Sequence, residues 1–295
     1  MFSLVLSSFL FGLAYPLASV LIGDVDALEF AFHFLLVLTL LQLPLVLMKW
    51  REILKMTFQK EFSLLFVSGL IGTFLYWCEF SSLNVGLPIS HLTFLSLTVP
   101  AWTLLYEYVR GRGTGWNLNK WVIALIGSAI LIAPNSKGQF SAAYLLPIFT
   151  SLLMAFWIIY SKKAQENGIS PVVCAFFNDF FSLIGITFFI YIKGRGHSLT
   201  MPHNIDKIAY YAVLTGIIPN LLLFYGLKKT KVTAAASIIM LEPIFIGIAT
   251  IVATNEDITF NLMAGVLFIV ASNLPDHFLT YARRMAVVYS QNTFK

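Results

Sequence analysis

Several carboxylates and histidines lie within long apolar stretches of this 295-residue sequence, where ionisable side chains are costly. A charge at the centre of a bilayer costs about 2.5–3.5 kcal/mol on insertion scales, so each such residue marks a candidate functional site. We expect two groups that differ in depth. One group lies about a helical turn from one end of its apolar stretches, and the other lies ~10–15 Å from the opposite end at 1.5 Å per residue. The first group is His33, Glu79 and His91; the second is Asn178, Asp179, Asn220 and Glu242.

The first group is predicted to act in gating or proton coupling. A histidine near a carboxylate titrates in the physiological range, so His33 and His91 with Glu79 would form a proton-sensitive cluster. The alternative is structural: both histidines hydrogen-bond backbone carbonyls near the headgroups, and Glu79 reaches water.

The second group is predicted to coordinate a substrate. Two alternatives remain open, since Asp179 would be structural if it paired with Lys162 or Lys163, and Glu242 would be structural if it stabilised the helix break at Pro243. A glutamate that bonds backbone groups while helices move would satisfy both interpretations.

Aromatic side chains complete the predicted substrate site. His91, Phe94, Thr98 and Trp102 recur at i, i+3, i+7 and i+11, which places them on one helical face. Most such stripes pack or face lipid, but a histidine and a threonine favour an inward orientation. The predicted substrate-binding residues are Tyr76, Trp77, Phe94, Thr98, Trp102, Asn178, Asp179, Asn220, Phe224 and Glu242.

The composition is that of a polytopic membrane protein. Hydrophobic residues make up 58% and charged residues 11% of the sequence, with a mean hydropathy of +0.82. A soluble protein of this length needs more polar surface than that. The basic residues form short clusters between apolar stretches, which is typical of topology signals and not of nucleic-acid binding. Cys78 and Cys174 lie inside apolar stretches and no metal-binding spacing occurs, so no cofactor is expected.

With about 20 residues needed to cross the hydrocarbon, the sequence predicts an all-α protein with ten transmembrane helices. The predicted spans are 3–22, 29–48, 62–83, 88–109, 119–134, 141–161, 171–192, 207–226, 233–253 and 260–280.

Lysine and arginine predict the orientation, because they are enriched in cytoplasmic loops. If both termini are cytoplasmic, 15 of the 19 basic residues lie inside and only Lys137, Lys193, Arg195 and Lys207 lie outside. The prediction is a multi-pass protein of the inner, or cytoplasmic, membrane.

An internal repeat divides the chain. Residues 69–134 and 216–280 share a glycine-started span, a span with a central proline (Pro100, Pro243) and a further span. Five spans are an odd number, so the second half enters the membrane from the opposite side. We expect inverted five-helix repeats at 1–137 and 138–295, which is a transporter architecture.

The second half also resembles the EamA-like repeat of the drug/metabolite transporter superfamily. The similarity rests on the segment 155–163, Tyr225-Gly226-Leu227, the small residues 234–237, Leu241-Glu242-Pro243 and the segment 255–259. The resemblance implies a ten-helix basket with a substrate cavity between its halves and no cofactor.

These observations predict a secondary transporter that works by alternating access on a small amphipathic metabolite, such as an amino acid or a related compound. Buried carboxylates with few buried cations favour a zwitterionic or cationic substrate. A channel and a membrane-embedded enzyme are the alternatives. The expected partners are this substrate, a coupling proton and the lipid bilayer.

Overall fold

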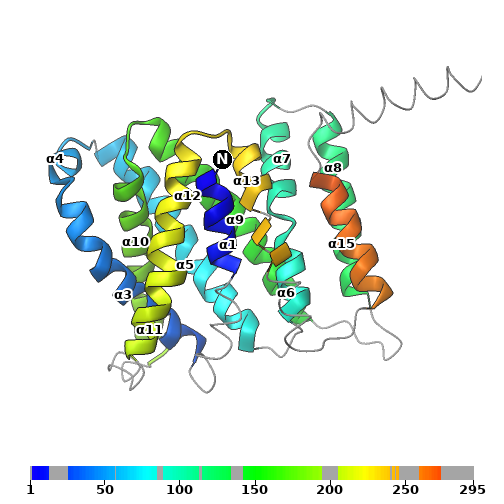
Figure 1. Ribbon diagram of the computed structural model, residues 1–295, viewed down its shortest axis with the longest axis horizontal. Coiled ribbons are helices and arrows are strands. Elements are labelled where there is room, and N and C mark those ends of the chain that lie inside the picture. The colour runs from blue at the N-terminus through cyan, green and yellow to red at the C-terminus, as the bar shows by residue number, and fades with distance from the viewer. Residues whose placement is uncertain are drawn as a thin grey trace, which may run out of the picture.

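The computed structural model describes residues 2–12, 26–56, 58–84, 89–112, 115–133, 142–194, 205–239, 241–242, 244–245 and 259–273. Within these ranges the regular structure is entirely helical, and most helices stand side by side (Figure 1). The predicted all-α class is therefore confirmed.

Six segments are long and apolar enough to cross a membrane. They contain α3 (Ala27–Leu47), α5 (Ser63–Asn84), α8 (Gly115–Ile132), α9 (Leu145–Glu166), α10 (Pro171–Ile192), and α11 (Ile205–Tyr211) continued by a π-helix (Ala212–Ile217) into α12 (Ile218–Lys228). Short elements precede two of them: α4 (Trp50–Ile53) and a π-helix (Phe58–Phe62) before α5, and a 3₁₀ turn (Ala142–Tyr144) before α9.

The other four predicted spans contain shorter described helices. These are α1 (Phe2–Gly12), α6 (Ile89–Ser96) with α7 (Val99–Val109), α13 (Val232–Ile239) and α15 (Phe260–Asn273). The remaining parts of spans 3–22, 233–253 and 260–280 fall largely outside the described residues, so the ten-helix arrangement is not established by helix length.

Prolines interrupt two of the spans. The predicted span 88–109 is divided by a turn at Leu97 and Thr98, and Pro100 follows at the second position of α7. Proline has no N–H and its ring clashes with the preceding turn, so it favours a helix start over a helix interior. Pro219 holds the same position in α12, directly after the widened π-helical turn.

Helices from the first part of the sequence pack mainly against helices from the second. α1 packs on α12, α5 on α9 and α10, α3 on α10, α7 on α13, and α8 on α15. If residues 69–134 and 216–280 are equivalent, α5 corresponds to α12 and α1 to α9. The pair α1 with α12 is then the counterpart of the pair α9 with α5. Three further cross-pairs, α3 with α10, α7 with α13 and α8 with α15, then join equivalent helices, whereas α5 with α10 does not.

Small residues allow the closest of these crossings. A Cβ atom on Gly127 of α8 would lie 2.8 Å from the Gly265 carbonyl oxygen, and one on Gly265 of α15 would lie 2.7 Å from the Gly127 carbonyl oxygen. Neither position has room for a side chain unless the two backbones separate.

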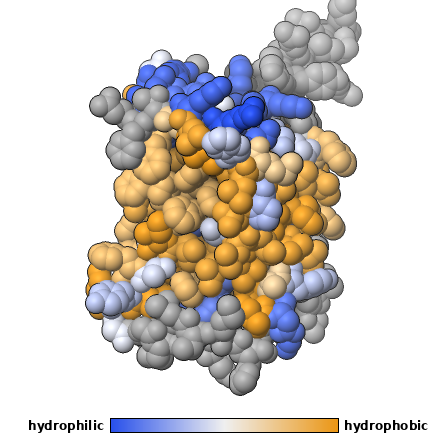
Figure 2. Space-filling model, turned by 90° about the vertical axis from the view of Figure 1, so that its left-hand side faces the viewer, coloured by the Kyte–Doolittle hydropathy of each residue, from blue (hydrophilic) through white to orange (hydrophobic). Residues whose placement is uncertain are grey.

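A broad apolar band crosses the visible face of the molecule between two more hydrophilic ends (Figure 2). Hydrophilic residues are concentrated at the upper end, where the N-terminus, α4 and the connection between α12 and α13 lie in Figure 1. This distribution is that of a protein embedded in a bilayer.

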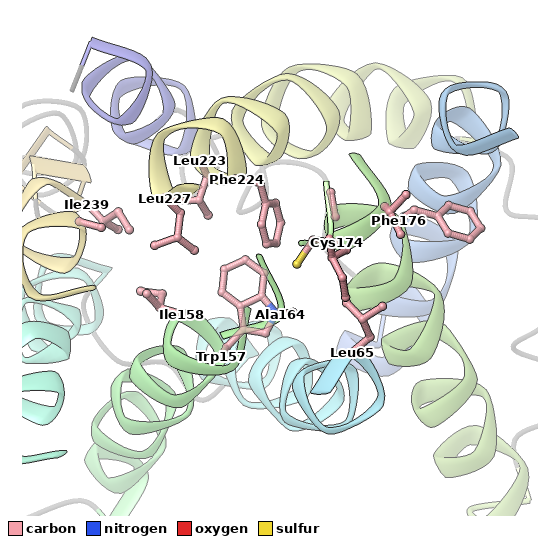
Figure 3. Packing of buried hydrophobic residues seen from close by; sticks show 14 of the residues in the cluster. Leu65, Trp157, Ile158, Ala164, Cys174, Phe176, Leu223, Phe224, Leu227 and Ile239 are labelled. Atoms are coloured by element: carbon pink, nitrogen blue, oxygen red, sulfur yellow. The ribbon is translucent and has the colours of Figure 1, made fainter. Parts of the chain in front are cut away.

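The largest apolar core lies between α5, α9, α10 and α12. Trp157 of α9 and Phe224 of α12 face each other there with ring centroids 5.4 Å apart and planes at 65° (Figure 3). Cys174 of α10 is buried in the same core, as the sequence predicts.

Candidate functional site

A cavity with two lobes lies at the junction of helices from both halves of the sequence. The lobes have empty volumes of about 470 and 580 Å³, which include space open to the outside. Leu75, Glu79, Met154 and Glu242 line both lobes, so the lobes share one wall.

Two carboxylates stand out on this otherwise apolar shared wall. Glu79 belongs to α5, and Glu242 lies beyond α13 in a region where the structure describes residues 241–242 and 244–245. Among the described residues that line the two lobes there is no lysine, arginine or histidine. The cavity therefore offers hydrogen-bond acceptors and negative charge to a ligand.

In the first lobe, hydrogen bonds hold the Ser151 hydroxyl in place. Ser151 of α9 accepts hydrogen bonds from the Thr98 hydroxyl (2.7 Å) and the Trp102 indole N–H (3.0 Å), and donates one to the Ile148 carbonyl (2.7 Å). Thr98 and Trp102, both predicted substrate ligands, thus act here through Ser151. The turn that divides α6 from α7 places them next to α9.

The second lobe rests on a hydrogen-bond network around Asp179 of α10. Its carboxylate accepts from Gln42 Nε2 of α3 (2.9 Å), the Tyr76 hydroxyl of α5 (3.2 Å) and Asn220 Nδ2 of α12 (3.4 Å). Tyr76 and Asn220 also line the lobe, whereas Asp179 is only 1% exposed. Asp179 consequently fixes two residues of the cavity wall.

The structural alternative for Asp179, a pairing with Lys162 or Lys163, does not occur among the described contacts. Lys162 instead donates to the carbonyls of Leu227 (2.9 Å) and Lys228 (3.2 Å) at the end of α12. Lys163 lies over the rings of Tyr106 and Tyr160, 5.2 and 4.8 Å from their centroids. A lysine near a helix C-terminus meets unpaired carbonyls, and these bind its ammonium group.

The second lobe brings together residues from both predicted depth groups. Glu79 lines it with Glu242 and Asn220, although the sequence places Glu79 in the first group and the other two residues in the second.

The two histidines lie apart from the shared wall. His33 is 1% exposed and its Nδ1 lies 2.9 Å from the Glu29 carbonyl oxygen, which is the structural alternative considered for it. His91 Nδ1 lies 2.9 Å from the Tyr144 hydroxyl, so one of its partners is a side chain.

Seven of the ten predicted substrate ligands are absent from the described lining of the two lobes: Thr98, Trp102 and Asp179, which lie behind it, and Trp77, Phe94, Phe224 and Asn178. Trp77 contacts Phe189 and lies under the Lys193 ammonium, Phe94 is buried beside Leu131 and Ile269, and Phe224 is fully buried against Trp157. Asn178 donates to the Ser161 hydroxyl (3.2 Å) and to the Cys174 carbonyl (2.9 Å).

Sequence reasoning missed other residues of the site. Ser151, Thr150 and Met154 line the first lobe, and Gln42 bonds Asp179 from outside the second. Gln42 carried a usable signal, because it is an amide within an apolar stretch. The serine and threonine carried none, since such hydroxyls commonly bond their own helix backbone.

Residues 141–274 match the model of the EamA-like transporter family. The second part of this chain is thus similar to EamA-like transporters. The resemblance predicted from the sequence is thereby confirmed, and the family is one of membrane transporters.

The EamA-like segment supplies about half of the cavity. It contains Thr150, Ser151, Asn220 and Glu242, while Tyr76 and Glu79 come from the part of the chain that precedes it. The cavity is therefore formed jointly by this segment and the preceding helices.

A solved structure described as "Crystal structure of protein" has a similar fold. The similarity covers 96% of this chain and 97% of that one, with a TM-score of 0.63 and 17% sequence identity. Among curated proteins none matches this chain.

Proposed function

We propose that this protein is a secondary transporter and that the two-lobed cavity binds its substrate. The observation that carries the proposal is that Glu79 and Glu242, one from each part of the sequence, line both lobes. An acidic wall inside an apolar membrane protein requires a cationic partner or a proton.

The proposed substrate is a small amphipathic metabolite with an ammonium group, such as an amino acid or a related compound. Glu79 and Glu242 would bind the ammonium group, and the hydroxyls of Thr150 and Ser151 would bind a second polar group. The apolar side chains Leu75 and Met154 suit the body of such a molecule.

Alternating access is the proposed mechanism. The pairing of helices across the two parts of the chain supports it, because equivalent helices meet and each repeat packs on the other. Inverted repeats of this kind enclose a site near the membrane midplane and move relative to each other. A proton on either cavity carboxylate would couple substrate movement to a proton gradient.

A test is counterflow of radiolabelled amino acids and amines in proteoliposomes that contain the full chain. We expect saturable uptake that a trans substrate stimulates, and at least about a tenfold loss in Glu242→Gln and Glu79→Gln, since a hydrogen bond to a charged group contributes about 1.5–3 kcal/mol. Asp206→Asn is the matched control, because Asp206 is exposed and outside the cavity.

Two results would contradict the proposal. Wild-type rates in both glutamine variants, with normal insertion, would remove the carboxylates from the site. A steady ionic conductance without saturation or trans-stimulation would favour a channel.

A further inference from the structure

A second cavity, which we call the basic vestibule, lies between the α7–α8 connection and the helices α9 and α13. Its empty volume is about 1160 Å³, which includes space open to the outside. Its walls come from both parts of the chain and include Lys231 of the α12–α13 connection, which lies at the upper end of the molecule in Figure 1. Its charged residues are Arg112, Lys162, Lys163, Lys231, Glu107 and Glu166.

The vestibule carries an excess of positive charge. Four cationic and two anionic side chains line it, which leaves a net charge of +2 (4 − 2). Lys162 is held by the Leu227 and Lys228 carbonyls and lies 3.9 Å from Glu166. These carbonyl contacts neutralise Lys162 only in part.

Arg112 and Lys231 line the vestibule from different parts of the chain. Both are exposed, Arg112 just after α7 and Lys231 just before α13. Val232 and Thr233, which begin α13, also line it. The N-terminus of a helix attracts anions, so α13 adds to the field of the side chains.

We propose that the basic vestibule binds a phosphate-bearing anion that bridges the two parts of the chain. A phosphate monoester carries a charge of about −1.5 to −2 near neutral pH, which matches the net charge of the vestibule. The planar guanidinium of Arg112 can donate two parallel hydrogen bonds to phosphate oxygens, and the ammonium groups of Lys163 and Lys231 supply point charges. Two sources share this chemistry, a soluble phosphate and the headgroup of an anionic lipid, because basic pockets at membrane surfaces bind such headgroups.

The test is thermal unfolding of the purified full chain in two arms. In one, sodium phosphate replaces sodium chloride at constant ionic strength; in the other, phosphatidylglycerol replaces phosphatidylcholine in the detergent micelles. A bound ligand raises the melting temperature in proportion to its occupancy. A shift in the phosphate arm supports a soluble phosphate, and a shift in the lipid arm alone supports a headgroup.

Variants make the test specific. We expect Arg112→Ala combined with Lys231→Ala to raise the midpoint concentration of the shift about tenfold or more. Glu107→Gln removes a negative charge from the wall and should lower that midpoint. Lys55→Ala is the control, because Lys55 is an exposed cation outside the vestibule.

The proposal would be overturned by an absent shift in both arms, or by equal midpoints in the wild type, the double variant and Lys55→Ala. Since Arg112 and Lys231 are exposed, their loss should leave folding intact. The outcome is independent of substrate transport, because neither residue lines the two-lobed cavity.

Discussion

Asp179 joins four helices by hydrogen bonds alone. Its carboxylate accepts from Gln42, Tyr76 and Asn220, and no cation lies among the partners recorded for it. Replacement of Asp179 by asparagine turns one acceptor oxygen into an NH₂ group, which then faces the donors that the carboxylate had bound. We therefore expect Asp179→Asn to lower the free energy of unfolding by about 1–3 kcal/mol, measured as a lower melting temperature in detergent.

Tyr76→Phe removes only one of the three donors, so its effect should be smaller than that of Asp179→Asn. Asp206→Asn, at an exposed position, should leave the melting temperature unchanged. Wild-type stability in Asp179→Asn would show that the network does not hold these helices together.

At the level of single residues, sequence reasoning identified Asp179, Asn220, Tyr76 and Glu242 as belonging to one region. The free-energy cost of placing such polar side chains in an apolar stretch can be recognised from the sequence alone. Their hydrogen-bond partners could not be predicted from the sequence, because these depend on which helices pack together. Gln42, for example, is 137 positions away from Asp179.

The crossing of α8 and α15 depends on two glycines. A side chain at Gly127 would meet the Gly265 carbonyl at 2.8 Å, and the two backbones would have to separate. We expect Gly127→Val to lower the melting temperature or the yield of folded protein in size-exclusion chromatography. Overpacking of this kind typically costs about 1–3 kcal/mol.

Gly115→Ala is the control on the same helix, since a Cβ there meets nothing within 4 Å. Alanine at that position should be neutral or slightly stabilising. Equal stability of Gly127→Val and the wild type would show that the α8–α15 contact tolerates separation.

The elements were predictable to different degrees. The sequence predicts a span at 171–192, and α10 has those bounds because Ser170 caps it and Pro171 begins it. The span 88–109 is wrong as a single helix. The apolar periodicity continues through Thr98 and gives no sign of a turn. The Thr98 hydroxyl contacts the Leu95 carbonyl and the Ser151 hydroxyl, and these contacts stabilise the turn.

For the whole molecule, the excess of basic residues in one set of loops predicts that both termini are cytoplasmic. We expect Lys55→Cys to react with a membrane-impermeant maleimide only from the cytoplasmic side, and Lys193→Cys only from the outside. Both positions are exposed and lie at the ends of different connections. The background would lack Cys78 and Cys174, which are buried.

Reaction of both cysteines from the same side would contradict this topology. The unmodified background should give no signal from either side. Exposure of the two positions makes a negative result in both variants inconsistent with the described fold.

The overall class followed from composition, because an apolar fraction of 58% permits few other solutions. The packing of α1 on α12 and of α5 on α9 could not be predicted from the composition. It depends on the shapes of surfaces that lie far apart in the sequence.

This pairing bears on how the chain is made. Gly69 and Thr73 of α5 fit against Phe181 and Gly185 of α10, and α5 also packs on α9. During synthesis α5 enters the bilayer first, so its contact surfaces remain covered by lipid until some hundred further residues have left the ribosome. The first half on its own is therefore an unfinished intermediate, and assembly of the native bundle must wait for the second half.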